Sequence, residues 1–335
     1  MWSCIDTKYD ELTERRNVMT TLYIFGNGFD IAHGIETPYS AFRKFLSKRH
    51  ESFLTRFEAM YNIQPLDDSE PWYTADAQER WNKNVVKDLW EEFEKVIGQP
   101  NIDEMYDFAQ TLAEQMPEYG IADTLDDYWK REYAFSSDLQ KYVLEWLQTI
   151  ETSHCSCRKR SLVGDNEDYF INFNYTDILE RIYKIKNVLH IHGGIPTCSE
   201  KPPLMGHGNK FLIDDNKNKA KKYREEGVEW AYSGHKAISR FVESLYKDTE
   251  SIIDENEHFF DALAEVERIV CLGISFGDVD VPYLERILQE AKHQVEWIVY
   301  YYSDNDRKRL EDVFGILGIT RRYQVLFKHS DTFWD

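Results

Sequence analysis

The sequence predicts an α/β fold in which helices cover both faces of a mostly parallel β-sheet. Short apolar runs rich in β-branched and aromatic residues recur along the chain, and segments with helical periodicity separate them. Most of these runs end at a turn that contains Gly, Asn or Ser. With 335 residues, of which 42% are hydrophobic, the chain is long enough to bury a sizeable core.

The first predicted strand is Thr21–Phe25, a short apolar run that ends at a glycine turn. This pattern predicts a buried strand that leads through a tight turn into a helix. Pro38 interrupts the helical pattern of residues 30–50, so a new helix is expected from Ser40. An apolar stripe on that helix is formed by Ala41, Phe42, Phe45 and Leu46.

Five further strands are predicted downstream. The second and third are separated by Thr176–Lys186, which is long enough for one short crossover helix. A strand–helix–strand unit of this length implies parallel pairing. The five strands are Tyr169–Asn174, Val188–His192, Arg268–Ser275, Glu296–Tyr302 and Gln324–Phe327. Strands that alternate with helices in this way predict a Rossmann-like architecture.

Capping residues mark the ends of several predicted helices. Asp177 and Asp280 follow the second and fourth predicted strands, and each is expected to cap the helix that begins there. Ser303, together with Asp304, is expected to cap the helix after the fifth strand, and Gly318 is expected to end it.

The predicted domain organisation has three parts. Residues 1–18 are expected to be an N-terminal extension, and they show no apolar run typical of a signal peptide. Residues 19–335 are expected to form one α/β domain with helical insertions at about 51–165 and 196–265. Residues 51–150 are rich in Trp and Tyr, and we expect these side chains to form the core of the insertion. The same segment is the first place to look for an assembly surface.

The bulk composition excludes several classes of protein. A formal net charge of −20 argues against non-specific binding of nucleic acid, because phosphates are repelled. Five cysteines at irregular spacing argue against a disulfide framework and favour a reducing cytoplasm. Cys155 and Cys157 stand too close together for a usual zinc site, and no metal is expected. No apolar run reaches 18 residues, so no membrane span is expected.

A glycine-rich motif follows the first predicted strand. Glycines let a backbone turn with positive φ and come close to a ligand, and the following helix directs free N–H groups at that space. Pyrophosphate is the natural occupant, although a tight turn without a ligand remains the alternative. The spacing departs from the Gly-x-Gly-x-x-Gly fingerprint of ordinary dinucleotide folds. The candidate binding residues are Gly26, Asn27, Gly28, Phe29, Asp30 and Gly34.

A second motif, Asn172–Asp177, stands at the end of the second predicted strand, where ligands bind in open α/β sheets. Alternation places Asn172, Asn174 and Thr176 on one side. Neutral amides there can bond to ribose hydroxyls or hold a water molecule. The alternative is a strand end whose amides are bonded locally.

The third and fourth motifs also follow strands. His192 precedes Gly193 at the end of the third predicted strand, and an imidazole there can act as a general base. His190 is expected to be structural, although His190, His192 and His207 could together bind a metal. In the fourth motif, Leu272–Asp280, Gly273 and Ser275 form a turn that can contact ribose or phosphate, or that simply joins a strand to a helix.

Taken together, the four motifs resemble the sirtuin-like NAD-binding superfamily. Gly26, Gly28, Gly34 and Ile35 fall on the spacing of the sirtuin motif Gly-Ala-Gly-x-Ser-x-x-x-Gly-Ile-Pro. Asn174 matches the central Asn of Thr-x-Asn-x-Asp, and Thr176 replaces its final Asp. His192 precedes a glycine as the sirtuin catalytic histidine does, but the zinc-binding cysteine pairs of sirtuins are absent.

More closely, residues 20–335 resemble the AbiH family of bacteriophage abortive infection proteins. That resemblance rests on Gly-Asn-Gly-Phe-Asp-x-Ala-His-Gly, Asn-Phe-Asn-Tyr-Thr, His-Ile-His-Gly, Gly-His-Gly and Gly-x-Ser-Phe-Gly, in this order. Because sirtuin-like domains of defence proteins often destroy NAD, the resemblance implies an NAD glycohydrolase that depletes NAD on infection. Such an activity must be held off until infection, and self-association as a homo-oligomer, a phage ligand and a defence partner protein are all open as the switch.

The resemblance assigns roles to the candidate residues. Asn174 would position ribose or water, His192 would act as general base, and Gly26–Phe29 would cradle pyrophosphate. Asp30 and Ser275 are candidates for contacts to ribose or adenosine. The remaining candidate binding residues are Gly34, Thr176, Gly193 and Gly273. Two rivals stay open at this point. One is an NAD or ADP-ribose sensor that does not turn over its ligand, and the other is a metal-dependent hydrolase or nuclease. Nothing in the sequence separates NAD from NADP.

Overall fold

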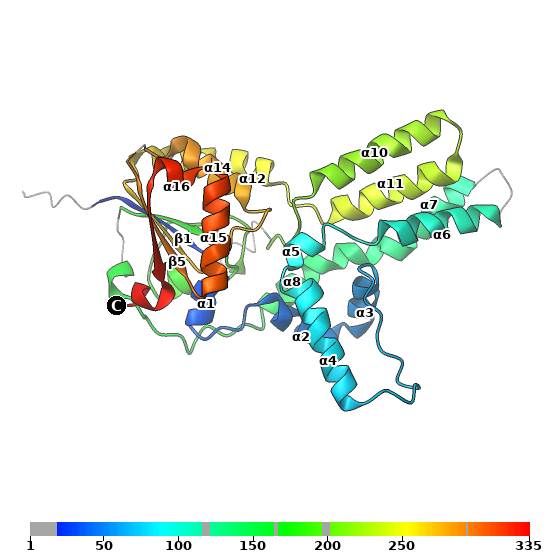
Figure 1. Cartoon of the computed structure of the whole chain (residues 1–335), viewed down its shortest axis with the longest axis horizontal. Coiled ribbons are helices and arrows are strands. Elements are labelled where there is room, and N and C mark those ends of the chain that lie inside the picture. The colour runs from blue at the N-terminus through cyan, green and yellow to red at the C-terminus, as the bar shows by residue number, and fades with distance from the viewer. Residues whose placement is uncertain (1–18, 116–120, 164–166, 196–201, 293) are drawn as a thin grey trace, which may run out of the picture.

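A computed structural model describes residues 19–115, 121–163, 167–195, 202–292 and 294–335. The predicted extension, residues 1–18, lies outside the described residues. Six parallel strands form one sheet in the order β3-β2-β1-β4-β5-β6 (Figure 1). The strands are β1 (Thr21–Phe25), β2 (Tyr169–Asn172), β3 (Val188–His190), β4 (Arg268–Leu272), β5 (Glu296–Tyr301) and β6 (Gln324–His329). The predicted α/β fold with a Rossmann-like parallel sheet is therefore confirmed.

The strand order creates a switch point between β1 and β4. The chain runs from β1 to β2 and β3 on one side, then returns to β4, β5 and β6 on the other. In open α/β sheets the crevice beyond the carboxyl ends of the strands at such a point is where ligands bind. The turns after β1 and β4 carry the first and fourth sequence motifs, so both motifs flank this crevice.

Helices bury both faces of the sheet. Side chains alternate along each strand, so successive residues pack on opposite faces. Leu22 and Ile24 of β1 pack on one face, and Phe25 packs on the other. The first face is covered by α12 (Thr249–Glu255), α13 (Glu257–Asp261), α14 (Val281–Glu290), α15 (Asp304–Ile316) and α16 (Ile319–Arg322). The second is covered by α1 (Asn27–Ala32), α9 (Ile178–Arg181) and the 3-10 turn Ser330–Phe333.

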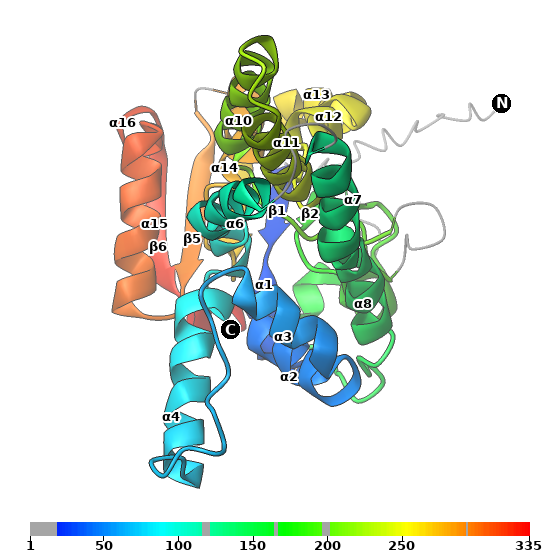
Figure 2. The same cartoon turned by 90° about the vertical axis from the view of Figure 1, so that its right-hand side faces the viewer.

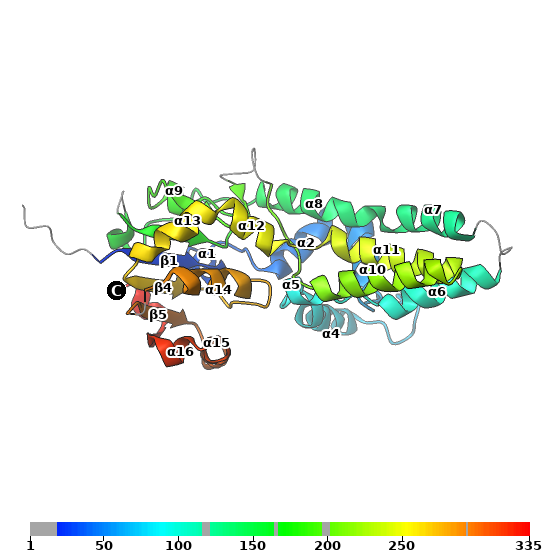
Figure 3. The same cartoon turned by 90° about the horizontal axis from the view of Figure 1, so that it is seen from above.

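The remaining helices form a separate body beside the sheet, which we call the helical body (Figures 1 and 3). Figure 2, viewed from that side, shows the hairpin of α10 and α11 at one end and α4 at the other. Its first helices are α2 (Tyr39–Arg49), α3 (Glu51–Ala59), α4 (Ala75–Val85) and α5 (Phe93–Val96). They are followed by α6 (Ile102–Glu114), α7 (Ile121–Tyr133), α8 (Asp138–Leu147), α10 (Lys210–Glu225) and α11 (Glu229–Ser244).

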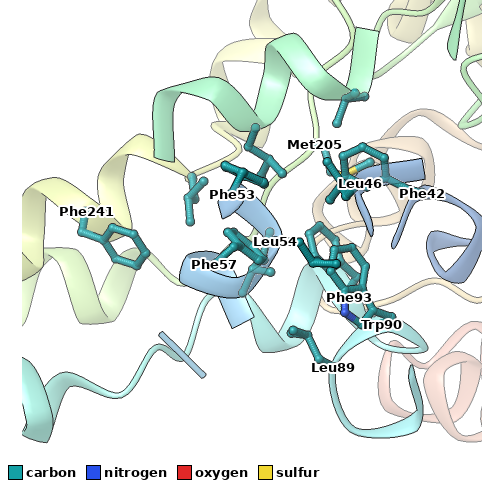
Figure 4. Close-up of a cluster of buried hydrophobic side chains, with 14 of the residues drawn as sticks. Phe42, Leu46, Phe53, Leu54, Phe57, Leu89, Trp90, Phe93, Met205 and Phe241 are labelled. Atoms are coloured by element: carbon teal, nitrogen blue, oxygen red, sulfur yellow. The ribbon is translucent and has the colours of Figure 1, made fainter. Parts of the chain in front are cut away.

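Aromatic side chains fill the core of the helical body, as predicted (Figure 4). Trp90 and Phe93 stack with ring centroids 4.7 Å apart, and Phe42 lies against Trp90 at 6.0 Å. Such pairs add to the stabilisation that area burial already provides. The core joins the two long segments of the chain, since Phe241 of α11 belongs to it as well.

Strand ends and caps differ from the prediction in detail. Strands β2, β3 and β4 stop two or three residues early, because the chain leaves the sheet at Phe173, Ile191 and Gly273 to form the site turns. Asp280 and Asp177 occupy N-cap positions, but neither carboxylate caps its helix. The predicted cap at Ser303 is confirmed, since its side chain accepts the amide of Asp306. The predicted helix end at Gly318 is also confirmed, since Gly318 has a φ of 69°.

Among the residues that the structure describes, no helix combines the length and the apolar character that crossing a bilayer requires.

Candidate functional site

The turns after β1 and β4 are pressed together at the switch point. A Cβ atom built on Gly28 would lie 2.6 Å from Cα of Gly273, and one on Gly26 would lie 2.6 Å from the Gly273 oxygen. Gly273 also has a φ of 69°, which side chains rarely adopt. These glycines therefore permit a close backbone contact between two strands' turns, a reason that motif spacing alone did not reveal.

That contact uses amides that the glycine motif was expected to offer to phosphate. The N–H of Gly26 donates to Leu272 O at 3.0 Å, and the N–H of Gly28 donates to Gly273 O at 2.9 Å. The Phe29 amide donates to Gly26 O at 2.9 Å. Asn27, the first residue of α1, has an amide with no acceptor inside the helix. Three of the four amides of Gly26–Phe29, which were expected to bind pyrophosphate, are therefore already bonded within the protein.

A cavity of about 850 Å³ opens at this point of the sheet. Its walls come from the turns after β1, β2, β3 and β4, from the ends of β5 and β6, and from the helical body. Eight of the predicted site residues line it. They are Gly26, Asn27, Gly28, Asp30, Asn174, His192, Gly273 and Ser275.

Four predicted binding residues do not line the cavity. Phe29 is fully buried against Phe25, with ring centroids 4.3 Å apart. Thr176 is also fully buried, behind the wall. Gly34 and Gly193 have φ values of 78° and 68° and serve turns. These four residues support the site without lining the cavity, because each is used in packing or in a turn.

Asp30 is tied to the end of the second strand region. The hydroxyl of Thr176 donates to its carboxylate, 2.9 Å from each oxygen. Burial of the carboxylate raises the pKa of Asp30 to about 8, although the Thr176 hydrogen bond opposes that shift. Asp30 therefore fastens α1 to the segment after β2, while its edge reaches the cavity wall.

Asn174 braces the glycine turn. Its side-chain Nδ2 donates to Gly26 O at 2.9 Å, and its backbone amide donates to Asn172 Oδ1 at 3.0 Å. Asn174 is 5% exposed and lines the cavity. The predicted amide is thus present at the wall, and it also holds the first motif in place.

The other two histidines of the metal hypothesis are held elsewhere. His190 Nε2 lies 2.6 Å from Glu180 Oε1. His207 uses both ring nitrogens, since Nε2 lies 2.9 Å from Val242 O and Nδ1 accepts the Asn209 amide at 3.0 Å. Within the described ranges, no group of three His, Cys, Asp or Glu side chains lies close enough to hold a metal ion.

A buried polar cluster surrounds His192. Its Nδ1 lies 3.5 Å from Lys247 Nζ, and its Nε2 lies 4.0 Å from Asp280 Oδ1. The ammonium of Lys247, which is 0% exposed, pairs with Glu94 Oε1 at 2.5 Å. His192 Nε2 and Asp280 Oδ1 have no hydrogen-bond partner, although both are buried. His192, Asp280 and Glu94 line the cavity.

Burial sets the electrostatics of this cluster. Burial, assisted by the nearby charge of Lys247, lowers the pKa of His192 well below its usual value of 6.5. Burial also raises the pKa of Asp280 to about 7, and Glu94 raises it further while Lys247 lowers it. At neutral pH the imidazole is neutral, and the Asp280 carboxyl is close to half ionised.

The cluster is assembled from segments far apart in the sequence. Glu94 lies on α5, at the end of the helical body that faces the sheet in Figures 1 and 3. Lys247 lies between α11 and α12, and Asp280 begins α14. Tyr39 of α2 hydrogen bonds to Glu94, and Tyr175 follows β2.

Sequence reasoning missed Glu94, Lys247 and the two tyrosines, and it treated Asp280 only as a cap. Glu94 looks like one more surface charge in an acidic helix, and Lys247 stands in a stretch without a recognisable motif. One signal was available for Asp280, because it closes the fourth motif immediately after the strand that ends at the switch point.

The fold and the site define an α/β protein with a Rossmann-like parallel sheet and a cavity at its topological switch point. The family model described as bacteriophage abortive infection AbiH matches residues 22–301, so the chain belongs to the AbiH family. Searches of curated proteins and of solved structures find no match for the chain.

Proposed function

We propose that this abortive infection protein binds NAD in the switch-point cavity and hydrolyses the bond between nicotinamide and ribose. The loss of NAD would then arrest the infected cell. The observation that carries the proposal is the buried pair of His192 and Asp280, whose unpartnered atoms face each other at the cavity wall. Unsatisfied polar atoms at a ligand cavity are the groups that a substrate or water would satisfy.

The cavity suits a dinucleotide in size and charge. Its volume of about 850 Å³ lies in the range that ligand sites of proteins occupy. Asp280 and Glu94 supply negative charge at one part of the wall, which favours the cationic nicotinamide ring. Arg158 lines another part and suits the phosphates, whereas Arg309 there is paired with Asp306 at 2.9 Å.

An aromatic part of the wall suits the adenine base. Trp334 lines the cavity, and the guanidinium of Arg158 lies 4.4 Å from the centre of its ring. Tyr302, at 79% exposed, also lines the cavity. Flat aromatic and guanidinium surfaces of this kind stack on bases. The proposed ligand therefore lies with adenosine toward Trp334 and nicotinamide toward His192.

Hydrolysis at this position mainly requires the protein to orient the substrate and the attacking water. Nicotinamide leaves as a neutral molecule, and the transition state resembles an oxocarbenium ion, as in other glycoside hydrolyses. Asn174 would orient ribose or the attacking water, and His192 would lie beside the bond that breaks. The sirtuin-like resemblance supports this arrangement, since it marks the same two residues and both line the cavity.

The test is nicotinamide release from NAD by the purified full chain, with and without phage lysate. His192→Ala is expected to lower the rate of release at least about 100-fold, because it removes a group placed at the reacting bond. His258→Ala, on an exposed position of α13, serves as the matched control and should match the wild type. Equal rates for all three proteins would refute the role of His192. No release under any condition would refute the enzyme.

A second candidate function is a sensor that binds NAD or ADP-ribose without turnover. It is favoured by one observation, that Glu94 and Lys247 bring both long helical segments into contact with the site. A ligand could shift the helical body through these contacts, and a homo-oligomer or a defence partner could respond. Calorimetry that shows binding of NAD, followed by recovery of unchanged NAD, would favour the sensor. Light scattering with and without NAD would test assembly.

A further inference from the structure

Asp280 stands at the N-cap of α14 but does not cap it. Its carboxylate makes no capping hydrogen bond to the helix; instead it accepts the amide of Gly277 and lies against His192. We propose that Asp280 is the proton acceptor of the hydrolysis, and that His192 beside it is a hydrogen-bond donor to substrate or water. This inference rests on the proposed function, and it replaces the imidazole with a carboxylate as the base.

The tautomer of His192 supports this division of roles. An ammonium group has only donors, so the Nδ1 atom that lies 3.5 Å from Lys247 Nζ must be the acceptor of that contact. The ring proton of the neutral imidazole therefore resides on Nε2, which faces Asp280 Oδ1 at 4.0 Å. An Nε2–H group can donate to a carboxylate, to ribose or to water, but it cannot take a proton.

Asp280 meets the three requirements of a general base. It lines the cavity, so it is within reach of a bound substrate. Its Oδ1 atom has no partner, so it is free to accept a proton from a water molecule. Burial brings its pKa to about 7, which is where a base that works at neutral pH is most effective.

The groups that face Asp280 come from every element packed around it. Glu94 raises its pKa and Lys247 lowers it. The neutral His192 lies at 4.0 Å, and the phenol of Tyr283 on α14 has no hydrogen-bond partner. Tyr39 and Tyr175 also interact with its charge. Because Lys247 is the cation among these groups, it keeps Asp280 from remaining protonated throughout the neutral range.

In the proposed hydrolysis, the bond between C1′ of ribose and the ring nitrogen breaks, and its electron pair leaves with nicotinamide, which becomes neutral. The oxygen of one water molecule forms a bond to C1′, and one of its protons passes to the carboxylate of Asp280. The products are ADP-ribose and nicotinamide, and Asp280 later releases the proton to solvent. Before the transfer, the ionised carboxylate stabilises the positive charge on the sugar.

The experiment compares Asp280→Asn with the wild type and with Asp278→Asn in the full chain. Asp278 lies on the same turn but is exposed and outside the cavity wall, which makes it the matched control. D280N keeps the size of the side chain, so its Kd for NAD by calorimetry is expected to stay within about threefold of the wild-type value. Its nicotinamide release is expected to fall at least about 100-fold, as for the loss of a general base. D278N is expected to match the wild type in both.

The pH profile provides a second readout. The wild-type kcat is expected to rise with one deprotonation near pH 7 and then to level off, and D280N is expected to lack that rise. If D280N does not fold, as judged by its melting temperature, the wild-type profile decides alone. A single rise near pH 7 then supports the proposal, and a rate independent of pH between 5 and 8.5 overturns it.

The outcomes separate this inference from the function on which it rests. Nicotinamide release by the wild type together with at least a third of that rate in D280N overturns the role of Asp280 and leaves the hydrolase intact. Absence of release by the wild type overturns the hydrolase itself.

Discussion

At the scale of the residue, the glycine turns show how one motif can serve close packing and also line a cavity. Gly28 and Gly273 bring two backbones into contact where no Cβ fits. The Gly28 amide donates to the Gly273 carbonyl, and both residues also line the cavity. The same residues therefore hold β1 and β4 in register at the switch point and shape the space beyond it.

Gly28→Ala tests this packing role. Alanine favours a helix over glycine by up to about 1 kcal/mol, but its Cβ would lie 2.6 Å from the Gly273 backbone. Relief of such a clash by backbone movement costs about 1–3 kcal/mol, so the clash outweighs the gain. We expect a net loss of about 1–2 kcal/mol in the free energy of unfolding by urea.

Gly277→Ala is the control for that measurement, because a Cβ atom there meets nothing within 4 Å. Its stability is expected to stay within about 0.5 kcal/mol of the wild type. A Gly28→Ala protein as stable as the wild type would show that the two turns are not packed as described.

Site residues that end strands could be predicted, and those that arrive from elsewhere could not. Asn174 and His192 stand where a strand pattern stops, and the carboxyl edge of a parallel sheet collects such positions. Glu94 and Lys247 carry no local pattern, because their meeting depends on how two helical segments pack on each other. The position of Asp280 at the start of a helix was predicted, but its place in the site was not, since an Asp before a helix is usually a cap.

At the scale of the element, the strands were predictable because helices bury both faces of the sheet, which leaves short continuous apolar runs in the sequence. The individual helices of the helical body were not predicted one by one, since their polar faces and irregular links weaken the helical periodicity in the sequence. One buried ion pair links distant elements. The ion pair of Glu94 and Lys247 ties α5 to the connection between α11 and α12 directly behind His192.

Removal of Lys247 is expected to cost more than removal of Glu94. In Glu94→Gln the ammonium keeps Asp280 as a nearby anion, whereas in Lys247→Met two carboxylates are left without a cation. Breaking a buried ion pair costs about 3–5 kcal/mol, and we expect Lys247→Met to reach that range and Glu94→Gln to fall below it. The double variant should be destabilised by less than the sum of the two, as measured by urea unfolding.

Lys210→Met provides the contrast, because its pair with Glu250 is exposed. Its stability is expected to be almost unchanged. Additive effects of Glu94→Gln and Lys247→Met would show that the pair does not join the two segments.

At the scale of the whole molecule, two buried carboxyls and several buried histidines determine how stability changes with pH. The pKa of Asp30 rises to about 8 and that of Asp280 to about 7. A carboxyl with a raised pKa binds more protons in the folded state, so its contribution falls as pH rises. The lowered pKa values of His192 and His207 act in the opposite sense, mainly near and below the ordinary histidine value of 6.5.

The free energy of unfolding is therefore expected to fall between pH 6.5 and 8. In this window Asp30 and Asp280 must ionise in the folded protein. The unfolded chain still carries partly protonated histidines at pH 6.5, and their loss of charge toward pH 8 offsets part of the effect. The net loss expected over the window is roughly 1 kcal/mol. Asp30→Asn should remove more than half of that loss, because Asp30 has the higher pKa, and Asp278→Asn should leave it unchanged. Urea unfolding at pH 6.5 and 8 measures both, and a wild-type stability that rises across the window would mean that Asp30 and Asp280 are not buried as the fold places them.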